Sequence, residues 1–551
     1  KNILTEIKKE DYRFVHEDCE TKKTVLTEMQ QNIVDNVNLT SYSTYLLHGV
    51  TGSGKTEVYI KLIEKVLKMG KTAIVLVPEI SLTTQLISRF ERVFKNKIAA
   101  FHSALSEGEK YDEYRRIRRG EVSVVIGARS AVFAPLSNIG IIIIDEEHSS
   151  SYKQDNNPRY DAREIAKLRA EKNSFPVIMG SATPSLESYA RAKRQVYHLL
   201  EMKKRVNNHP LPTVNIVDMN EEIKYSKGHF SRKLISCINE TLEKNEQIIL
   251  LLNRRGYSSF VSCKSCSHTI KCPHCDITLT FHKTSNMLRC HYCGYAEKMT
   301  IECPNCHEMA MTSLGVGTEK IEEEIKKLFP TSRVLRMDVD TTSKKGMHKK
   351  MIDSFKNHEY DILLGTQIVA KGLDFPLVTL VGVINADTSL NIPDFRSSEN
   401  TFDLLSQVSG RSGRGASEGK VIIQTYNKEH YAITYSKTHD YEGFYNKEME
   451  IRKQLKYPPY FYLCYIKISS KDERLALIES TKIKKSLERN LKAMHILGPS
   501  PAFIFKINNV YHYGIIVKYK REDNLKPLLK KIIDHYKSNS KIKINIDFNP
   551  N

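Results

Sequence analysis

Eight cysteines in the middle of the chain have the spacing of metal ligands. They form four Cys-x-x-Cys pairs, and the three other cysteines of the chain stand alone. A Cys-x-x-Cys pair presents two thiolates from one turn, so four pairs supply the eight sulfurs that two tetrahedral Zn²⁺ sites need. We therefore predict two structural zinc sites, formed by Cys263, Cys266, Cys272, Cys275, Cys290, Cys293, Cys303 and Cys306.

The pairing of these cysteines has two interpretations. The inner pairs, Cys272/Cys275 and Cys290/Cys293, have a spacing close to that of a zinc-ribbon hairpin, which leaves the outer pairs to form a second, nested site. In the alternative, consecutive pairs join, because few residues separate Cys266 from Cys272. Four-thiolate sites leave no open position for a substrate, so the sites are predicted to be structural. Nearby histidines are expected outside the coordination shells: His268, His274, His291 and His307.

A second set of residues, 49–56 (Gly-Val-Thr-Gly-Ser-Gly-Lys-Thr), has the spacing of a phosphate-binding P-loop. It follows a short apolar run and precedes a helical pattern. In such loops glycines let backbone N–H groups surround the phosphates, while Lys55 would reach the β- and γ-phosphates and Thr56 would offer a hydroxyl to Mg²⁺. We expect ATP contacts from Gly49, Thr51, Gly52, Ser53, Gly54, Lys55 and Thr56.

An acidic motif ends an apolar run farther along the chain. Residues 141–144 are four isoleucines, and Asp145-Glu146-Glu147-His148 follows them. An aspartate at the end of a buried strand can hold Mg²⁺, and the next carboxylate can orient or deprotonate the attacking water. A solvated acidic turn is the alternative, which the upstream P-loop disfavours. Lys55, Asp145 and Glu146 are therefore the predicted catalytic residues of an ATP-hydrolysing site.

Two α/β patterns must position these motifs. Short β-branched runs alternate with amphipathic stretches from about residue 25 to 200, which predicts a parallel sheet. A second series of such runs begins at residues 247–252 and resumes after the cysteines, so the cysteine-rich segment is an insertion in the second series. After about residue 427 the order of runs predicts a small α+β domain.

The motifs in this order resemble those of superfamily 2 helicases, and Asp-Glu-Glu-His is similar to the acidic motif of the primosomal protein N′ (PriA) family. The resemblance covers nearly the whole chain and includes residues 26–30, 77–82, 127–130, 180–185, 253–258, 365–374 and 407–414. It implies an α/β fold with two RecA-like P-loop helicase lobes. It also implies an inserted two-zinc cysteine-rich module in lobe 2 and a small C-terminal α+β domain.

The resemblance also implies further contacts to ATP. Gln30 would contact the adenine base, while Gly372, Asp374 and Gln407 would complete the site from the second lobe. Arg411 and Arg414 would bring guanidinium groups to the γ-phosphate and stabilise charge in the transition state, which makes both of them candidate catalytic residues.

A loop at residues 149–163 follows the acidic motif and interleaves Tyr152 and Tyr160 with basic side chains. Aromatic faces stack on bases while cations meet phosphates, so this composition favours contact with single-stranded DNA. An ordinary polar loop with packed tyrosines is the alternative. The resemblance implies that the loop couples DNA binding to ATP hydrolysis.

We expect five regions along the chain. Residues 1–22 would be a remnant or linker of a missing N-terminal region, because the residues before the P-loop are too few for the 3′-end-binding and winged-helix domains with which the family begins. Residues 23–206 would form lobe 1, and residues 207–262 and 307–427 lobe 2. Residues 263–306 would be the zinc insertion, and residues 428–551 the C-terminal domain.

The formal net charge of +20 predicts a polyanionic partner. The resemblance implies a 3′ to 5′ DNA helicase that remodels stalled replication forks and initiates primosome assembly. Forked and single-stranded DNA, the single-strand DNA-binding protein, primosome proteins and the replicative helicase loader are the implied partners. Two alternatives are a duplex translocase or RNA helicase, and a zinc-stabilised DNA-binding platform with a vestigial ATPase. No run suits a membrane or a signal peptide, so we expect a cytoplasmic, nucleoid-associated monomer.

Overall fold

The computed structural model describes residues 25–550 except for short internal segments, at 79–83, 102–104, 207–210, 223, 226–227, 253–259, 264–267, 283–285, 314–317, 339–340, 342–346, 367–374, 414–417, 493 and 522–523. It divides into two compact units. Unit 1 is Lys1–Pro210, Thr342–Ile352 and Lys371–Asp374. Unit 2 is Leu211–Thr341, Asp353–Ala370 and Phe375–Asn551.

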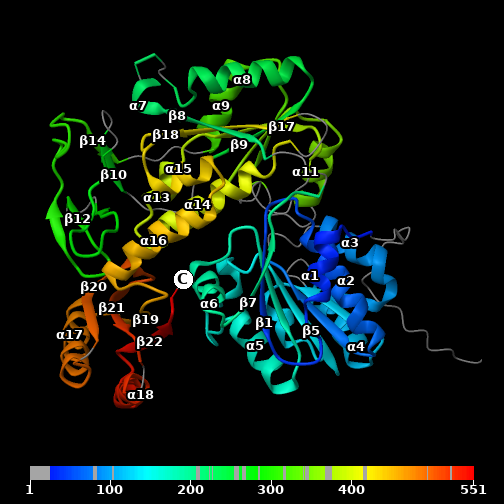
Figure 1. Ribbon diagram of the computed structural model, residues 1–551. Coiled ribbons are helices and arrows are strands. Elements are labelled where there is room, and N and C mark those ends of the chain that lie inside the picture. The colour runs from blue at the N-terminus through cyan, green and yellow to red at the C-terminus, as the bar shows by residue number, and fades with distance from the viewer. Residues whose placement is uncertain are drawn as a thin grey trace, which may run out of the picture. The chain divides into compact units, whose positions relative to one another are not determined.

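Unit 1 is built on a seven-stranded parallel sheet of order β3-β4-β2-β5-β6-β1-β7 (Figure 1). Its strands are β1 (Thr44–Gly49), β2 (Thr72–Leu76), β3 (Ile98–Phe101), β4 (Val124–Gly127), β5 (Ile139–Asp145), β6 (Val177–Ser181) and β7 (His198–Met202). Its helices are α1 (Glu28–Asp35), α2 (Lys55–Lys68), α3 (Thr84–Phe94), α4 (Glu107–Arg118), α5 (Ala162–Asn173) and α6 (Leu186–Lys193). Strands that are buried on both faces explain the continuous β-branched runs of the sequence.

Unit 2 contains a second parallel sheet, of order β15-β16-β9-β17-β18-β8. Its strands are β8 (Thr213–Asp218), β9 (Gln247–Leu251), β15 (Val334–Met337), β16 (Ile362–Gly365), β17 (Val378–Val383) and β18 (Lys420–Thr425). The accompanying helices are α7 (Met219–Glu222), α8 (Arg232–Glu243), α9 (Thr318–Leu328), α13 (Asp387–Leu390), α14 (Ser397–Ser409), α15 (Tyr431–Lys437) and α16 (Tyr441–Leu455), and α11 (Met347–Lys356) spans a border between the units.

The cysteine-rich segment interrupts this second sheet between β9 and β15, as the sequence predicts (Figure 1). It consists of very short antiparallel strands. β10 (Val261–Cys263) pairs with β14 (Met311–Ser313), while β11 (Thr280–His282), β12 (Met287–Arg289) and β13 (Ala296–Lys298) form a three-stranded sheet. We call residues 261–313 the cysteine module.

The chain ends in a four-stranded antiparallel sheet of order β20-β21-β19-β22. Its strands are β19 (Tyr462–Ser470), β20 (His495–Ile507), β21 (Val510–Tyr519) and β22 (Lys543–Phe548), with helices α17 (Glu473–Asn490) and α18 (Leu525–Tyr536). This is the predicted small α+β domain, so the predicted fold class is confirmed in all its parts.

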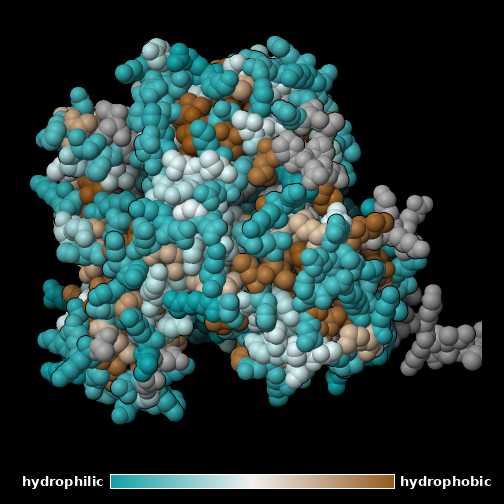
Figure 2. Space-filling view, viewed as in Figure 1, coloured by the Kyte–Doolittle hydropathy of each residue, from teal (hydrophilic) through white to brown (hydrophobic). Residues whose placement is uncertain are grey.

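The visible surface is mostly hydrophilic, with apolar patches scattered among the polar residues (Figure 2). Over the described part of the chain, no helix is long and apolar enough to cross a membrane.

Candidate nucleotide and metal sites

The P-loop connects the end of β1 to the start of α2. Gly54 caps α2 with a left-handed backbone, φ 80°. A Cβ at Gly54 would lie 2.3 Å from Nε2 of Gln30, so glycine is needed there for both its conformation and its size. Nζ of Lys55 donates to the carbonyl of Gly49 at 2.8 Å, while Ser53 Oγ is buried without a partner among the described residues. Such a loop fits the phosphates of a nucleotide, whose oxygens could accept hydrogen bonds from the Ser53 hydroxyl and the Lys55 ammonium group.

The acidic motif begins at the last residue of β5. Burial and, after it, the neighbouring charge of Glu146 together raise the pKa of Asp145 to about 6, while the charge of Lys55 opposes the shift. Glu146 adopts a positive φ of 48°. Two adjacent carboxylates near a lysine, together with the Thr56 hydroxyl, make a set of hard oxygen ligands that fits Mg²⁺.

The other two residues of the motif connect it to residues 180–188. The buried carboxylate of Glu147 accepts hydrogen bonds from the backbone N–H of Ser185 at 2.6 Å and from Ser188 Oγ at 2.9 Å. Nδ1 of His148 lies 2.8 Å from Ser181 Oγ. Movement of the acidic motif would therefore pull on the segment that follows β6.

Gln30, the predicted base contact, is 1% exposed and packs against the P-loop. Its Oε1 accepts from the N–H of Thr27 at 2.8 Å, in a capping box at the start of α1. Its Nε2 donates to the carbonyls of Ser53 and Gly54 at 3.2 and 3.3 Å. Contact between Gln30 and adenine stays a prediction.

The loop after the acidic motif differs from its expected role at one residue. Tyr152 is fully buried, and its hydroxyl donates to the carbonyl oxygens of Leu76 at 3.0 Å and Asp145 at 2.5 Å. The expectation that Tyr152 stacks on DNA bases is therefore wrong, because its ring is packed inside unit 1. Tyr160 is partly exposed and makes an edge contact with Phe133.

Two of the remaining predicted nucleotide-site residues are described in unit 2. Gln407 is buried in α14, and Arg411 follows the end of that helix. Gly372, Asp374 and Arg414 lie outside the described residues, as do Cys266 and the motif residues 79–82 and 253–258. Their roles stay predictions.

Seven of the eight predicted zinc ligands are described, and they gather in two groups. One group is Cys272, Cys275, Cys290 and Cys293, and the other is Cys263, Cys303 and Cys306. Within each group the sulfur atoms lie within 4.8 Å of one another. This is the nested arrangement, and consecutive pairing is absent from the described residues. Four sulfurs at such distances fit one tetrahedral Zn²⁺, and the second group needs only one more thiolate.

The predicted non-ligand histidines lie outside these described groups. Nδ1 of His291 lies 2.8 Å from the carbonyl oxygen of Pro501, and Ser500 Oγ donates to the carbonyl of His291 at 2.7 Å. His291 therefore helps to bind the cysteine module to β20 of the C-terminal domain.

A connection that the sequence does not reveal lies beneath the inner cysteine group. Tyr457 is 1% exposed, its ring stacks on Phe395 at 4.6 Å, and its hydroxyl donates to the carbonyl of Cys275 at 3.3 Å. The guanidinium of Arg452, also 1% exposed, pairs with Glu399 at 2.6 Å and with Glu448 at 2.9 Å. We call Arg452 and Tyr457, together with their partners Phe395, Glu399 and Glu448, the buried seat of the module.

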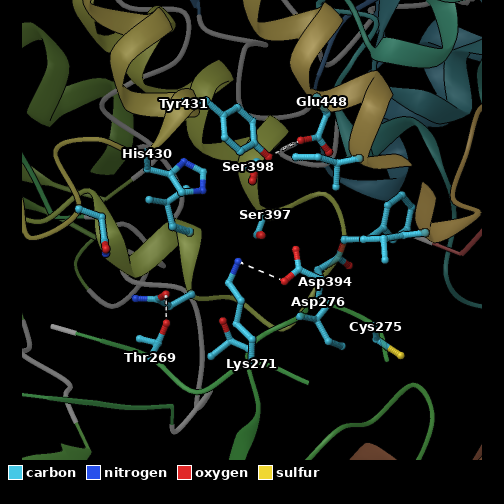
Figure 3. Close-up of a pocket in the computed structure, with 18 of the residues that line it drawn as sticks. Thr269, Lys271, Cys275, Asp276, Asp394, Ser397, Ser398, His430, Tyr431 and Glu448 are labelled. Carbon is cyan, nitrogen blue, oxygen red and sulfur yellow. Dashed lines mark hydrogen bonds and ion pairs between the residues drawn. The ribbon is translucent and has the colours of Figure 1, made fainter. Parts of the chain in front are cut away.

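A cavity of about 500 Å³ separates part of the cysteine module from α14, α15 and α16. Figure 3 shows Lys271 and Thr269 of the module on one side and His430 and Tyr431 on the other. Thr269 Oγ1 lies 3.3 Å from Oδ1 of Asn391, and Tyr431 donates to Glu448 at 2.5 Å. Polar contacts thus surround the cavity next to the seat.

Family models match four parts of the chain. Residues 27–192 match the DEAD/DEAH box helicase, and residues 294–416 the helicase conserved C-terminal domain. Residues 272–298 match the PriA DNA helicase Cys-rich region (CRR) domain, and residues 453–551 the primosomal protein N C-terminal domain.

Curated relatives match over most or all of the chain. The replication restart protein PriA of Bacillus subtilis is 52% identical over 562 residues, covering 100% of this chain and 70% of that protein. Its counterpart in Synechocystis is 46% identical over 506 residues, covering 90% of this chain and 61% of that protein. Among solved structures, RecG bound to a three-way DNA junction has a TM-score of 0.45 at 16% identity, covering 79% of this chain and 50% of that chain.

Proposed function

Because this chain belongs to the PriA family of superfamily 2 ATP-dependent helicases, we propose that it unwinds forked DNA 3′ to 5′ at stalled replication forks and initiates primosome assembly. The observation that carries this proposal is the joint presence of a P-loop and acidic site in unit 1 and two cysteine groups inserted in the second lobe. The chain spans 70% of the length of its Bacillus subtilis relative, and the activity of the whole protein belongs to the proposal.

We propose the following roles in unit 1, which the P-loop and the acidic motif support. Lys55 binds the β- and γ-phosphates, Asp145 and Thr56 hold Mg²⁺, and Glu146 orients the attacking water. Backbone groups of residues 49–54 surround the phosphates. ATP, when bound, supplies the phosphoanhydride bond whose hydrolysis drives movement of the lobes.

The second lobe completes the site in this proposal. Arg411 and Arg414 stabilise negative charge on the γ-phosphate in the transition state. Gly372, Asp374 and Gln407 contribute further contacts, and Gln30 reads the adenine. The five regions expected from the sequence keep their proposed limits.

The proposed nucleic-acid partners are forked and single-stranded DNA. The chain carries 84 lysines and arginines against 64 acidic residues, which suits a phosphate backbone. The proposed protein partners are the single-strand DNA-binding protein, other primosome proteins and the loader of the replicative helicase. We place the protein in the cytoplasm, associated with the nucleoid, as a monomer.

Strand displacement on matched DNA and RNA forks tests this function. The wild-type chain should unwind the DNA fork with ATP, and Glu146→Gln should bind the fork but leave it intact. Unwinding of the RNA fork alone would contradict the proposal. A wild-type chain that binds the DNA fork but leaves it intact in the presence of ATP would favour an assembly platform whose ATPase is vestigial.

A further inference from the structure

Tyr59 lies on α2, one turn after Thr56, and its side chain ends beside the acidic motif. The residue is 1% exposed, and its hydroxyl donates a 2.9 Å hydrogen bond to Oδ1 of Asp145. Residues three apart on a helix share a face, so Thr56 and Tyr59 leave α2 on the same side. The helix that begins with the P-loop lysine thus also contacts the carboxylate at the end of β5.

The hydrogen bonds around Asp145 constrain both its backbone and its side chain. Tyr152 donates to the carbonyl oxygen of Asp145 at 2.5 Å, while Tyr59 donates to the carboxylate. An ionised carboxylate has two oxygens, each with room for more than one partner. A hydrogen bond at Oδ1 therefore leaves Oδ2 available for a cation and fixes the direction in which Oδ2 points.

Gly180 provides the space for the Tyr59 hydroxyl. It pairs with Asp145 across β5 and β6. A Cβ at Gly180 would lie 1.7 Å from Oη of Tyr59 and 2.9 Å from Cζ. Since no heavy atom tolerates such a distance, any side chain at Gly180 would displace the phenol from Asp145. The glycine of the Gly180–Ser185 motif thus has a steric reason to be there.

We propose that Tyr59 is a positioning residue that orients the Asp145 carboxylate toward the magnesium ion of a bound magnesium nucleotide, in a space that Gly180 keeps open. Partners that orient a metal ligand typically change metal affinity about 10- to 100-fold when they are removed. The inference rests on the proposed function, in which Asp145 is the Mg²⁺ ligand. It adds a residue on α2 that contacts the proposed ligand, beside a strand, β6, that leaves space for its hydroxyl.

Binding of a fluorescent N-methylanthraniloyl ADP to the full chain tests the inference without relying on turnover. The ratio of the Kd in EDTA to the Kd in Mg²⁺ measures how much magnesium strengthens binding. Tyr59→Phe should lower this ratio about 10-fold and leave the Kd in EDTA unchanged. An unchanged or larger ratio would overturn the inference, because a phenol that only stabilises the fold, or that competes with the ion, predicts those results.

Three further variants make the result specific. Tyr45→Phe is the matched control, since Tyr45 is also buried in unit 1 and its hydroxyl accepts from the N–H of Asn38 at 3.0 Å, so the ratio should keep its wild-type value. Gly180→Ala should reproduce the Tyr59→Phe ratio and add little when both are combined. A Gly180→Ala chain with the wild-type ratio would contradict the steric role.

Asp145→Ala separates the inference from the proposed function. A wild-type ratio in Asp145→Ala would refute the assignment of Asp145 and the inference together. Loss of the magnesium effect in Asp145→Ala, with a normal ratio in Tyr59→Phe, would refute the inference alone.

Discussion

The nucleotide site of unit 1 and the cysteine module of unit 2 are held in place by different forces. Asp145 follows four isoleucines that are 0% exposed in the centre of a seven-stranded sheet. Each strand in the described part of the module is three residues long, and cysteines are five of the ten buried residues of its apolar cluster. The nucleotide site therefore rests on a hydrophobic core, whereas in the module we expect metal ligation to take the place of about half of such a core. A region of the first kind keeps its shape without its ligand, and one of the second kind does not.

Removal of zinc should have the largest effect on the fold of the module. If the module stayed folded without zinc, the contrast between the two regions would not hold. Structural zinc contributes about 10 to 16 kcal/mol to the folding of small metal modules. Cys272→Ala should release one zinc ion per chain and expose the module to hydrogen exchange, while the strands of unit 1 stay protected. Metal content and exchange mass spectrometry measure the two results. The matched control is Cys464→Ala, because Cys464 is buried in the C-terminal domain outside both cysteine groups, so both zinc ions should remain.

Loss of Arg452 should have the next largest effect, on the seat beneath the module. Arg452→Ala leaves the carboxylates of Glu399 and Glu448 buried without their cation, which typically costs about 3 to 5 kcal/mol of unfolding free energy. Urea titration followed by circular dichroism measures the loss. Arg232→Ala removes an ion pair to Glu222 in which the arginine side chain is 60% exposed, so a much smaller loss than in Arg452→Ala is expected. Equal losses in the two variants would show that the seat contributes no more than a surface pair.

Lys55→Ala should lower the kcat of ATP hydrolysis about 100-fold or more, because removing one group that stabilises transition-state charge has an effect of that size. Its unfolding free energy and its zinc content should stay at wild-type values, as the core and not the P-loop lysine holds unit 1 together. A coupled ATPase assay measures kcat. Lys65→Ala is the control on the same helix, because Lys65 pairs with the exposed Asp35 at 2.7 Å. Loss of zinc from Lys55→Ala would show that the two regions depend on each other.

The smallest predicted effect is on the stability of unit 1 at acidic pH. Burial lowers the pKa of His48 to about 4 from an ordinary value of 6.5. Between these values the unfolded chain binds a proton that the folded chain does not, so the contribution of His48 to stability is complete above pH 6.5 and is lost as pH falls to 4. His48→Gln should reduce the fall in unfolding free energy by about 1.4 kcal/mol per pH unit at most. Urea titrations at pH 5 and pH 7 measure it.

Both regions could be predicted from the sequence where local spacing determines the chemistry. The P-loop needs only consecutive residues between a strand and a helix, and a Cys-x-x-Cys pair needs only one turn. The α/β patterns likewise follow from runs of buried β-branched residues. Local spacing could not reveal contacts between residues far apart in the sequence. Tyr59 contacts Asp145 at a separation of 86 residues, and Tyr457 contacts Cys275 at a separation of 182 residues.

The error at Tyr152 has the same origin. Alternating aromatic and basic residues indicate a surface that binds single-stranded DNA, but the pattern does not say which ring turns inward. Packing against β2 and β5 decides this, through hydrogen bonds to the carbonyls of Leu76 and Asp145. Contacts of this kind depend on the completed sheet, and only the structure reveals them.

The bond between Ser500 and His291 has a consequence for synthesis on the ribosome. The two residues are 209 positions apart, so the cysteines are translated long before β20 exists. At about 5 to 20 residues per second, that interval lasts about 10 to 40 seconds, during which the module lacks its C-terminal contacts. Zinc can be captured in this interval, because the described ligands end at Cys306. The metal is therefore expected to enter during translation, and the C-terminal domain to close over an already folded module.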